Sequence, residues 1–146
     1  MIYLDNAGTT KLSKRAKEAM MPFLEEEYGN SSSLHTLGQR AKEYLEEARS
    51  KIAHCINAEP NEIYFTSGGT ESDNWAINSA CEYGRLTGKN HIITTKIEHH
   101  AVLHCVENLA KRGFEVTYLP VSRDGVINVE DVVNAITDKT CLVSVM

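Results

Sequence analysis

The chain has 146 residues, of which 42% are hydrophobic and 24% charged, as expected for an ordinary globular protein with a buried core. The net charge of −5 argues against a nucleic-acid surface, and no apolar run approaches the about 20 residues of a membrane-spanning helix. The first residues resemble no signal peptide. We therefore expect a cytoplasmic protein with no nucleic-acid and no membrane partner.

Residues 1–60 are predicted to form an N-terminal arm and a helical segment. Apolar residues recur at helical spacing over residues 16–24, behind a capping Ser13. Pro22 lacks an N–H, so we expect a kink or a stop there. A second helix is predicted from the apolar face that runs through residues 41–56.

Residues 61–146 alternate between β-rich and helical runs. Strands are predicted at Ile63–Thr66, His91–Thr95, Phe114–Leu119 and Cys141–Val145. Helices are predicted between them, the last one capped by Asn128 with Asp131 three residues on. This alternation predicts an α/β fold, with a mostly parallel sheet flanked by helices. A final strand without its covering helix suggests that the fold continues in a longer chain.

The strongest local signal is the run Thr66–Asn74, which joins the first predicted strand to a helix. Glycines and hydroxyls at a helix start suit a phosphate, because the first backbone N–H groups there lack partners. The run lacks both common nucleotide-loop patterns, so a cofactor monophosphate fits better than a nucleoside triphosphate. The alternative is an ordinary capping box of Thr70 and Asp73. Glu71 and Asp73 would repel a phosphate unless they point away from it.

A second signal is His99, in the loop after the strand at residues 91–95. This loop lies at the carboxyl edge of a parallel sheet, where ligands of such sheets gather. His99 is therefore placed to stack on a flat ring and to move protons. The alternative is a helix-capping or exposed histidine.

A metal site is the rival use of this stretch, since His100 and His104 share one helix face. No third ligand lies near them in the sequence, and we expect no metal centre. The four cysteines are irregularly spaced, and we expect all of them to be buried, reduced thiols. They are Cys55, Cys81, Cys105 and Cys141.

Four ordered segments resemble the cysteine desulfurases of the class-V aminotransferase family, which are fold-type-I pyridoxal-phosphate enzymes. The segments are Tyr3–Thr10, Gly29–His35, Thr66–Asn74 and Glu98–Val102. Tyr3–Thr10 by itself suits either a segment packed into a site or a turn that leads to the first helix. Two positions depart from the family pattern, which usually has Ala at Gly8 and Pro at Ser31.

The resemblance implies that Gly69 and Thr70 hold the phosphate of pyridoxal 5′-phosphate and that His99 stacks on its ring and assists proton transfer. It also implies a homodimer, L-cysteine as the substrate of the complete enzyme, alanine as product and a sulfur-acceptor protein as a possible partner. The fold implied for residues 61–146 is part of the cofactor-binding large domain.

The family's Schiff-base lysine, its pyridine-pairing aspartate and its persulfide-forming cysteine match no residue of this chain. The resemblance thus implies an N-terminal part that is inactive alone. Two alternatives remain open: another branch of the family, such as a selenocysteine lyase or an aminotransferase, and a non-catalytic remnant or binding module.

Overall fold

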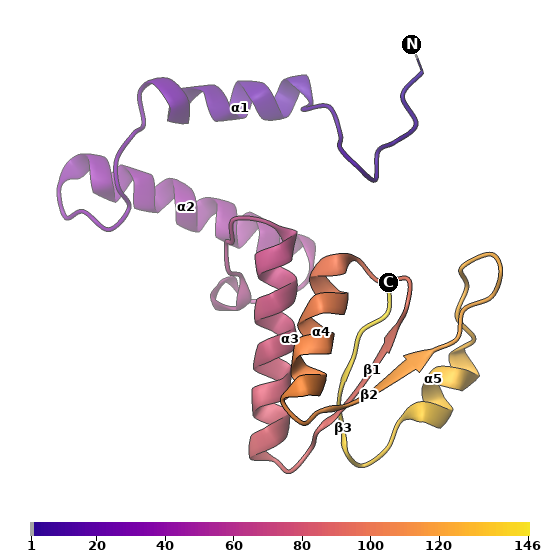
Figure 1. Ribbon diagram of the computed structural model, residues 1–146. Coiled ribbons are helices and arrows are strands. Elements are labelled where there is room, and N and C mark those ends of the chain that lie inside the picture. The colour runs from indigo at the N-terminus through magenta and orange to yellow at the C-terminus, as the bar shows by residue number, and fades with distance from the viewer. Residues whose placement is uncertain (1) are drawn as a thin grey trace. The chain divides into compact units, whose positions relative to one another are not determined.

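The computed structural model describes residues 2–146, which form two compact units divided between Tyr64 and Phe65 (Figure 1). The first unit is helical, and the second contains a sheet with helices. Within the described residues, no helix is both long enough and apolar enough to cross a membrane.

The first unit contains helices α1 (Lys14–Glu25) and α2 (Thr36–Cys55) and a short 3₁₀ helix (Pro60–Glu62). Ser13 caps α1 as predicted, by accepting a hydrogen bond from the amide of Ala16. Of the kink or stop predicted at Pro22, the stop is wrong, because α1 continues through this residue to Glu25. Proline removes one amide donor, but its carbonyl still accepts bonds from the amides of residues 26 and 27.

The N-terminal segment Tyr3–Thr10 is exposed and contains a turn, in which the amide of Gly8 donates to the carbonyl of Asp5 over 3.2 Å. Of the two interpretations of this segment, the turn before the first helix matches the structure. Each of its residues is open to solvent in the described chain.

The second unit is built on a parallel sheet with strands β1 (His91–Thr95), β2 (Glu115–Leu119) and β3 (Thr140–Val143). Their order is β2-β1-β3, and β1 pairs in parallel with both neighbours. All five residues of β1 are buried, as expected for a central strand with covered faces. The predicted parallel α/β fold is confirmed.

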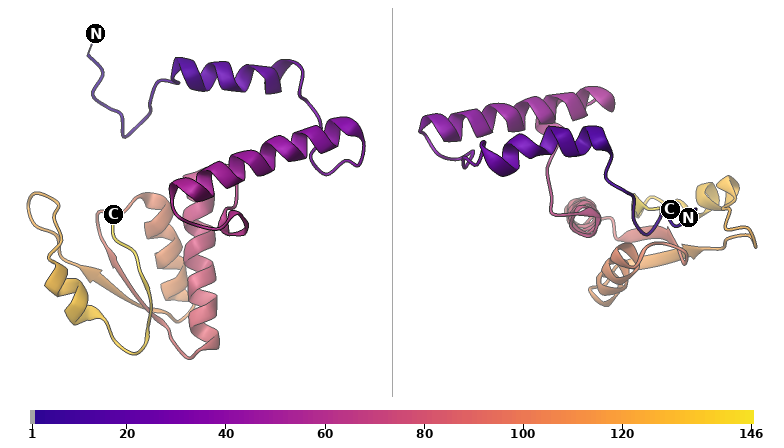
Figure 2. Two further views of the ribbon diagram at one scale, coloured as in Figure 1. Left: turned by 180° about the vertical axis from the view of Figure 1, so that it is seen from behind. Right: turned by 90° about the horizontal axis from the view of Figure 1, so that it is seen from above.

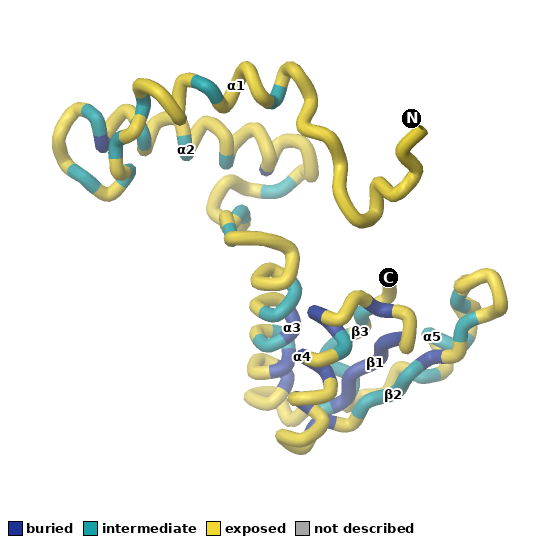
Figure 3. Tube along the Cα trace, turned by 45° about the horizontal axis from the view of Figure 1, so that its top comes forward, coloured by how far each residue is buried: buried dark blue, intermediate teal, exposed yellow. Residues whose placement is uncertain are grey.

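Two helices, α3 (Gly69–Leu86) and α4 (His100–Lys111), lie side by side against the sheet, and α5 (Val129–Ala135) lies toward its opposite face (Figure 2). Buried residues concentrate in β1 and on the inward sides of α3 and α4 (Figure 3). This core consists of Ile77, Cys81, Ile92, Val102, Cys105, Val106, Leu109 and Phe114.

Because α3 precedes β1 and α4 follows it, both helices begin at the carboxyl end of this central strand. That edge of the sheet is therefore the place where two helix starts meet.

The predicted strand at Ile63–Thr66 is wrong, because the segment forms no strand. A strand requires a neighbour that completes its hydrogen bonds. Within the described sheet, β1 has both sides occupied, and neither β2 nor β3 pairs with this segment. Its β-rich composition is real, but composition alone supplies no partner.

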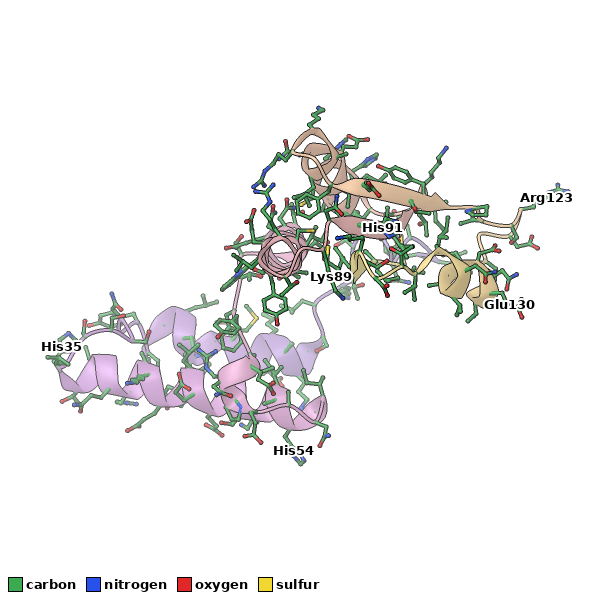
Figure 4. All side chains as sticks on the ribbon, turned by 90° about the horizontal axis from the view of Figure 1, so that it is seen from below. His35, His54, Lys89, His91, Arg123 and Glu130 are labelled. Carbon is green, nitrogen blue, oxygen red and sulfur yellow. The ribbon has the colours of Figure 1, made fainter. Side chains whose placement is uncertain are left out.

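His91 on the central strand is a structural histidine (Figure 4). Its Nδ1 lies 2.8 Å from the Thr140 hydroxyl, and its Nε2 lies 2.8 Å from the Thr117 hydroxyl. Both ring nitrogens thus link β1 to its neighbours. His91 is fully engaged within the sheet and takes no part in the site described below.

The prediction that all four cysteines are buried holds for two of them. Cys81 and Cys105 are buried, whereas Cys141 is half-buried and Cys55 is exposed. Burial raises the pKa of Cys81 to about 12, with a further contribution from Cys141, and burial also raises the pKa of Cys105. Both thiols therefore remain protonated at neutral pH, and all four cysteines are free.

Candidate functional site

The glycine turn before α3 leaves a helix start without a side-chain cap. Gly68 is the N-cap residue, and it has no side chain with which to accept a bond from the first turn. The predicted capping box of Thr70 and Asp73 does not form, because Thr70 already lies inside the helix. The amides of Gly69 and Thr70 thus belong to the first turn, where backbone donors favour an anion.

The two neighbouring carboxylates, Glu71 and Asp73, differ in how they lie about this helix start. The Glu71 carboxylate accepts bonds of 2.7 Å from both the hydroxyl and the amide of Ser67. These two bonds lower the pKa of Glu71, the hydroxyl having the larger effect. Asp73 lines a different pocket, beside Leu142 and Val143 on β3. Asp73 therefore meets the condition set for phosphate binding, that the carboxylate points away. Glu71 does not, because Ser67, the residue before the N-cap Gly68, holds its carboxylate beside the helix start.

His99 caps α4, at the same edge of the sheet. Its Nδ1 accepts a hydrogen bond of 3.1 Å from the amide of Ala101. An accepting Nδ1 assigns the ring proton to Nε2, and among the described residues nothing is hydrogen-bonded to that nitrogen. The capping interpretation of His99 is thus confirmed. The cap also fixes the ring in one orientation, with Nε2 available to a ligand.

Thr70 and His99 line one open pocket of about 430 Å³ in the second unit. The pocket lies along the groove between α3 and α4, and its lining contains no carboxylate. The full lining is Thr70, Asn74, Asn78, His99, His100, Ala101, His104, Cys105 and Asn108. Two of the three predicted site residues therefore meet, and Gly69 adjoins the pocket through its bond to Thr70. These groups fit a phosphorylated, flat cofactor.

Two asparagines that the sequence reasoning missed join the walls of the pocket. Asn74 Nδ2 donates to the carbonyl of Thr70 over 2.8 Å and to the carbonyl of Ala101 over 3.3 Å. One turn further along α3, Asn78 Nδ2 donates to the carbonyl of Asn74 over 2.7 Å and to Cys105 Sγ over 3.3 Å. Asn74 thus ties the first turn of α3 to the first turn of α4. The i, i+4 spacing of the asparagines was the available signal.

A pair of histidines on α4 forms a further polar part of the pocket wall. The rings of His100 and His104 stack with centroids 5.4 Å apart and planes 14° apart. Within the described residues, no group of three or more His, Cys, Asp or Glu side chains is arranged around a metal position.

Fold and geometry together define an α/β unit in which the starts of α3 and α4 meet at the carboxyl end of β1, beside an open pocket between these two helices. The sequence pattern of the family described as Aminotransferase class-V matches residues 2–146. The chain belongs to that family.

Two similar proteins carry the name cysteine desulfurase. The chain is 51% identical over 145 residues to cysteine desulfurase IscS of Clostridium botulinum strain Hall and 51% identical to that of Methanosarcina thermophila. Each comparison covers 99% of this chain and 36% of the relative. The chain thus spans about a third of the length of these relatives.

Solved structures show the same likeness. A NifS-like protein superposes with a TM-score of 0.92 at 41% identity, over 99% of this chain and 40% of that one. DndA from Streptomyces lividans superposes with a TM-score of 0.85 at 46% identity, with the same two coverages. The predicted family and fold are confirmed for the residues compared.

Proposed function

We propose that this chain is the part of a pyridoxal-phosphate-dependent cysteine desulfurase that binds the phosphate and the ring of the cofactor. The observation that carries the proposal is the single pocket shared by Thr70 and His99. The relatives named cysteine desulfurase support the reaction, which converts L-cysteine to L-alanine and transfers the sulfur as a persulfide.

In this proposal each binding residue has one task. The amides of Gly69 and Thr70, with the Thr70 hydroxyl, hold the phosphate at the start of α3, and the absence of a carboxylate from the pocket lining favours an anion. The His99 ring lies against the pyridine, and its Nε2 holds or transfers a proton. Bound pyridoxal phosphate would supply an electron sink for negative charge that develops on the amino acid.

The proposal extends to the organisation of the whole enzyme. Residues 1–60 form an arm and helical segment, and residues 61–146 form part of the large domain that holds the cofactor. The complete enzyme is a cytoplasmic homodimer that serves iron–sulfur cluster assembly and passes sulfur to an acceptor protein. The present chain has no match to the lysine that carries the cofactor or to the cysteine that receives sulfur. It is therefore inactive alone.

Non-covalent binding of the cofactor can be tested separately from its covalent reaction with lysine side chains. 4′-Deoxypyridoxine 5′-phosphate has the ring and phosphate of the cofactor but lacks the aldehyde, so it cannot react with surface lysines. Trp75, the single tryptophan of the chain, follows Asn74 on α3 and reports binding through its fluorescence. The unphosphorylated 4-deoxypyridoxine is the matched ligand that isolates the phosphate.

We expect the phosphorylated ligand to bind more tightly than the unphosphorylated one. Thr70→Ala should weaken the phosphorylated ligand about tenfold or more, since a hydrogen bond to a charged group contributes roughly 1.5–3 kcal/mol. His99→Ala should weaken both ligands, because it removes a contact with the ring. Ser79→Ala, an exposed change on α3, is the control. Equal affinity of the wild-type chain for the two ligands would refute the phosphate seat.

Activity is tested separately, by measuring alanine released from L-cysteine with pyridoxal phosphate present. The purified chain is expected to release none above the free-cofactor background. Sustained turnover would show that the chain alone is a complete desulfurase and would contradict this part of the proposal.

A further inference from the structure

Two histidines of α4 lie one helical turn apart on the same face of the helix. His100 and His104 are both exposed, and their rings lie nearly parallel at 5.4 Å between centroids. Both line the pocket between α3 and α4. Side chains at positions i and i+4 lie on one face of a helix, and two histidines at this spacing are a recurrent way to bind zinc.

A neighbouring carboxylate gives an independent indication of a ligand role. Nδ1 of His104 lies 3.3 Å from the Glu107 carboxylate, so the Nδ1 proton is donated there. In the neutral ring this arrangement leaves Nε2 without a proton and able to bind a metal. A histidine that binds a metal almost always donates its other ring N–H to a carboxylate, a carbonyl or water.

Other groups of the pocket contribute less to such a site. Cys105 also lines it, but burial raises the pKa of this thiol, and its sulfur already accepts a bond from Asn78. Metals bind the thiolate form, so Cys105 is a poor ligand. No third His, Cys, Asp or Glu completes a cluster within the described chain. Any metal would therefore keep water ligands and exchange readily.

We propose that His100 and His104 form a two-histidine site for a divalent late transition-metal ion such as Zn²⁺, with Glu107 orienting His104 and water completing the coordination. Imidazole nitrogen suits Zn²⁺, Ni²⁺ and Cu²⁺. The site opens into the same pocket as Thr70 and His99, yet it needs neither residue. It is thus independent of the proposed cofactor function.

The test is equilibrium dialysis of the tag-free 146-residue chain against Zn²⁺. All variants, and the reference chain, carry Cys55→Ser, so that the exposed Cys55 thiol cannot contribute to zinc binding. His100→Gln and His104→Gln are each expected to weaken zinc binding about tenfold or more. Loss of a residue that only hydrogen-bonds a metal ligand already weakens metal binding by about that factor. Glu107→Gln is expected to weaken it by less than either histidine change.

The matched control is His54→Gln, which removes an exposed histidine in the last turn of α2 (Figure 4). This change should leave zinc affinity unaltered. Paramagnetic Ni²⁺ should broaden the backbone amide signals of α4 in an NMR spectrum, and His104→Gln should abolish the broadening. Unchanged zinc affinity in both the His100 and His104 variants, or broadening centred elsewhere, would overturn the proposal. Circular dichroism shows whether each variant retains its helices.

Discussion

The hydrogen bonds of Asn74 provide a sharp test of how the pocket is assembled. Asn74→Ala removes two bonds, one to Thr70 within α3 and one to Ala101 on α4. Asn78→Ala also removes two bonds, to Asn74 within α3 and to Cys105 on α4. At about 1 kcal/mol net for each bond, both variants should lose roughly 1–2 kcal/mol of the free energy of unfolding.

The two variants should differ in ligand binding, because only Asn74 bonds residues of the first turns of both helices. If the free energy of one such hydrogen bond, about 1 kcal/mol, is lost from ligand binding, the affinity falls about fivefold. We therefore expect 4′-deoxypyridoxine 5′-phosphate to bind Asn74→Ala about fivefold more weakly than wild type and Asn78→Ala almost normally. Urea unfolding gives the stabilities, and Trp75 fluorescence gives the affinities.

The comparison of the two variants decides the interpretation. Equal loss of stability with unequal loss of affinity supports Asn74 as a positioning residue. If both variants bind the ligand as wild type does, or lose affinity equally, the bond between the two helix starts does not organise the pocket.

Three further predictions concern stability and use unfolding curves. Gly84→Ala should destabilise the chain by about 1–3 kcal/mol, since the added Cβ would lie 2.5 Å from the Cβ of Cys141. Thr94→Val should stabilise it by about 1 kcal/mol, because the Thr94 hydroxyl is buried without a hydrogen-bond partner among the described residues; destabilisation would indicate an unseen partner. Hydrogen bonds from Ser67 lower the pKa of Glu71, so its stabilising effect is present above the ordinary carboxyl pKa of about 4.3 and is lost as the pH falls through the lowered value. The melting-temperature advantage of wild type over Glu71→Gln should therefore shrink across that acidic range, and an advantage that persists below it would refute the assignment.

Much of the second unit could be predicted from the sequence, because its elements are strongly patterned. The strand His91–Thr95 matches residue for residue, since a short apolar run between polar turns has few other solutions. The caps Ser13 and Asn128 also match, because capping is local chemistry. Asn128 bonds the amide of Glu130, one residue before the predicted Asp131.

Several of the failures share one cause, which is dependence on partners distant in the sequence. The strand predicted at Ile63–Thr66 has the right composition, but pairing is decided by which strands lie beside it. Burial of Cys55 was predicted from its helix face, yet in the first unit that position is exposed. The link from Asn74 to Ala101 joins residues 27 positions apart, which no local pattern reveals.

From the sequence, His99 was interpreted either as a ligand-stacking residue or as a helix cap. In the structure the two roles are compatible. Capping uses Nδ1, and a ligand would use Nε2 and the ring face. Because the cap is made by the chain itself, the ring orientation is set before any ligand arrives, and binding need not restrict it further. The two neighbouring helix starts thus differ: one begins at a histidine, and the other begins at a glycine turn. His99 caps the start of α4, whereas the start of α3 has no side-chain cap.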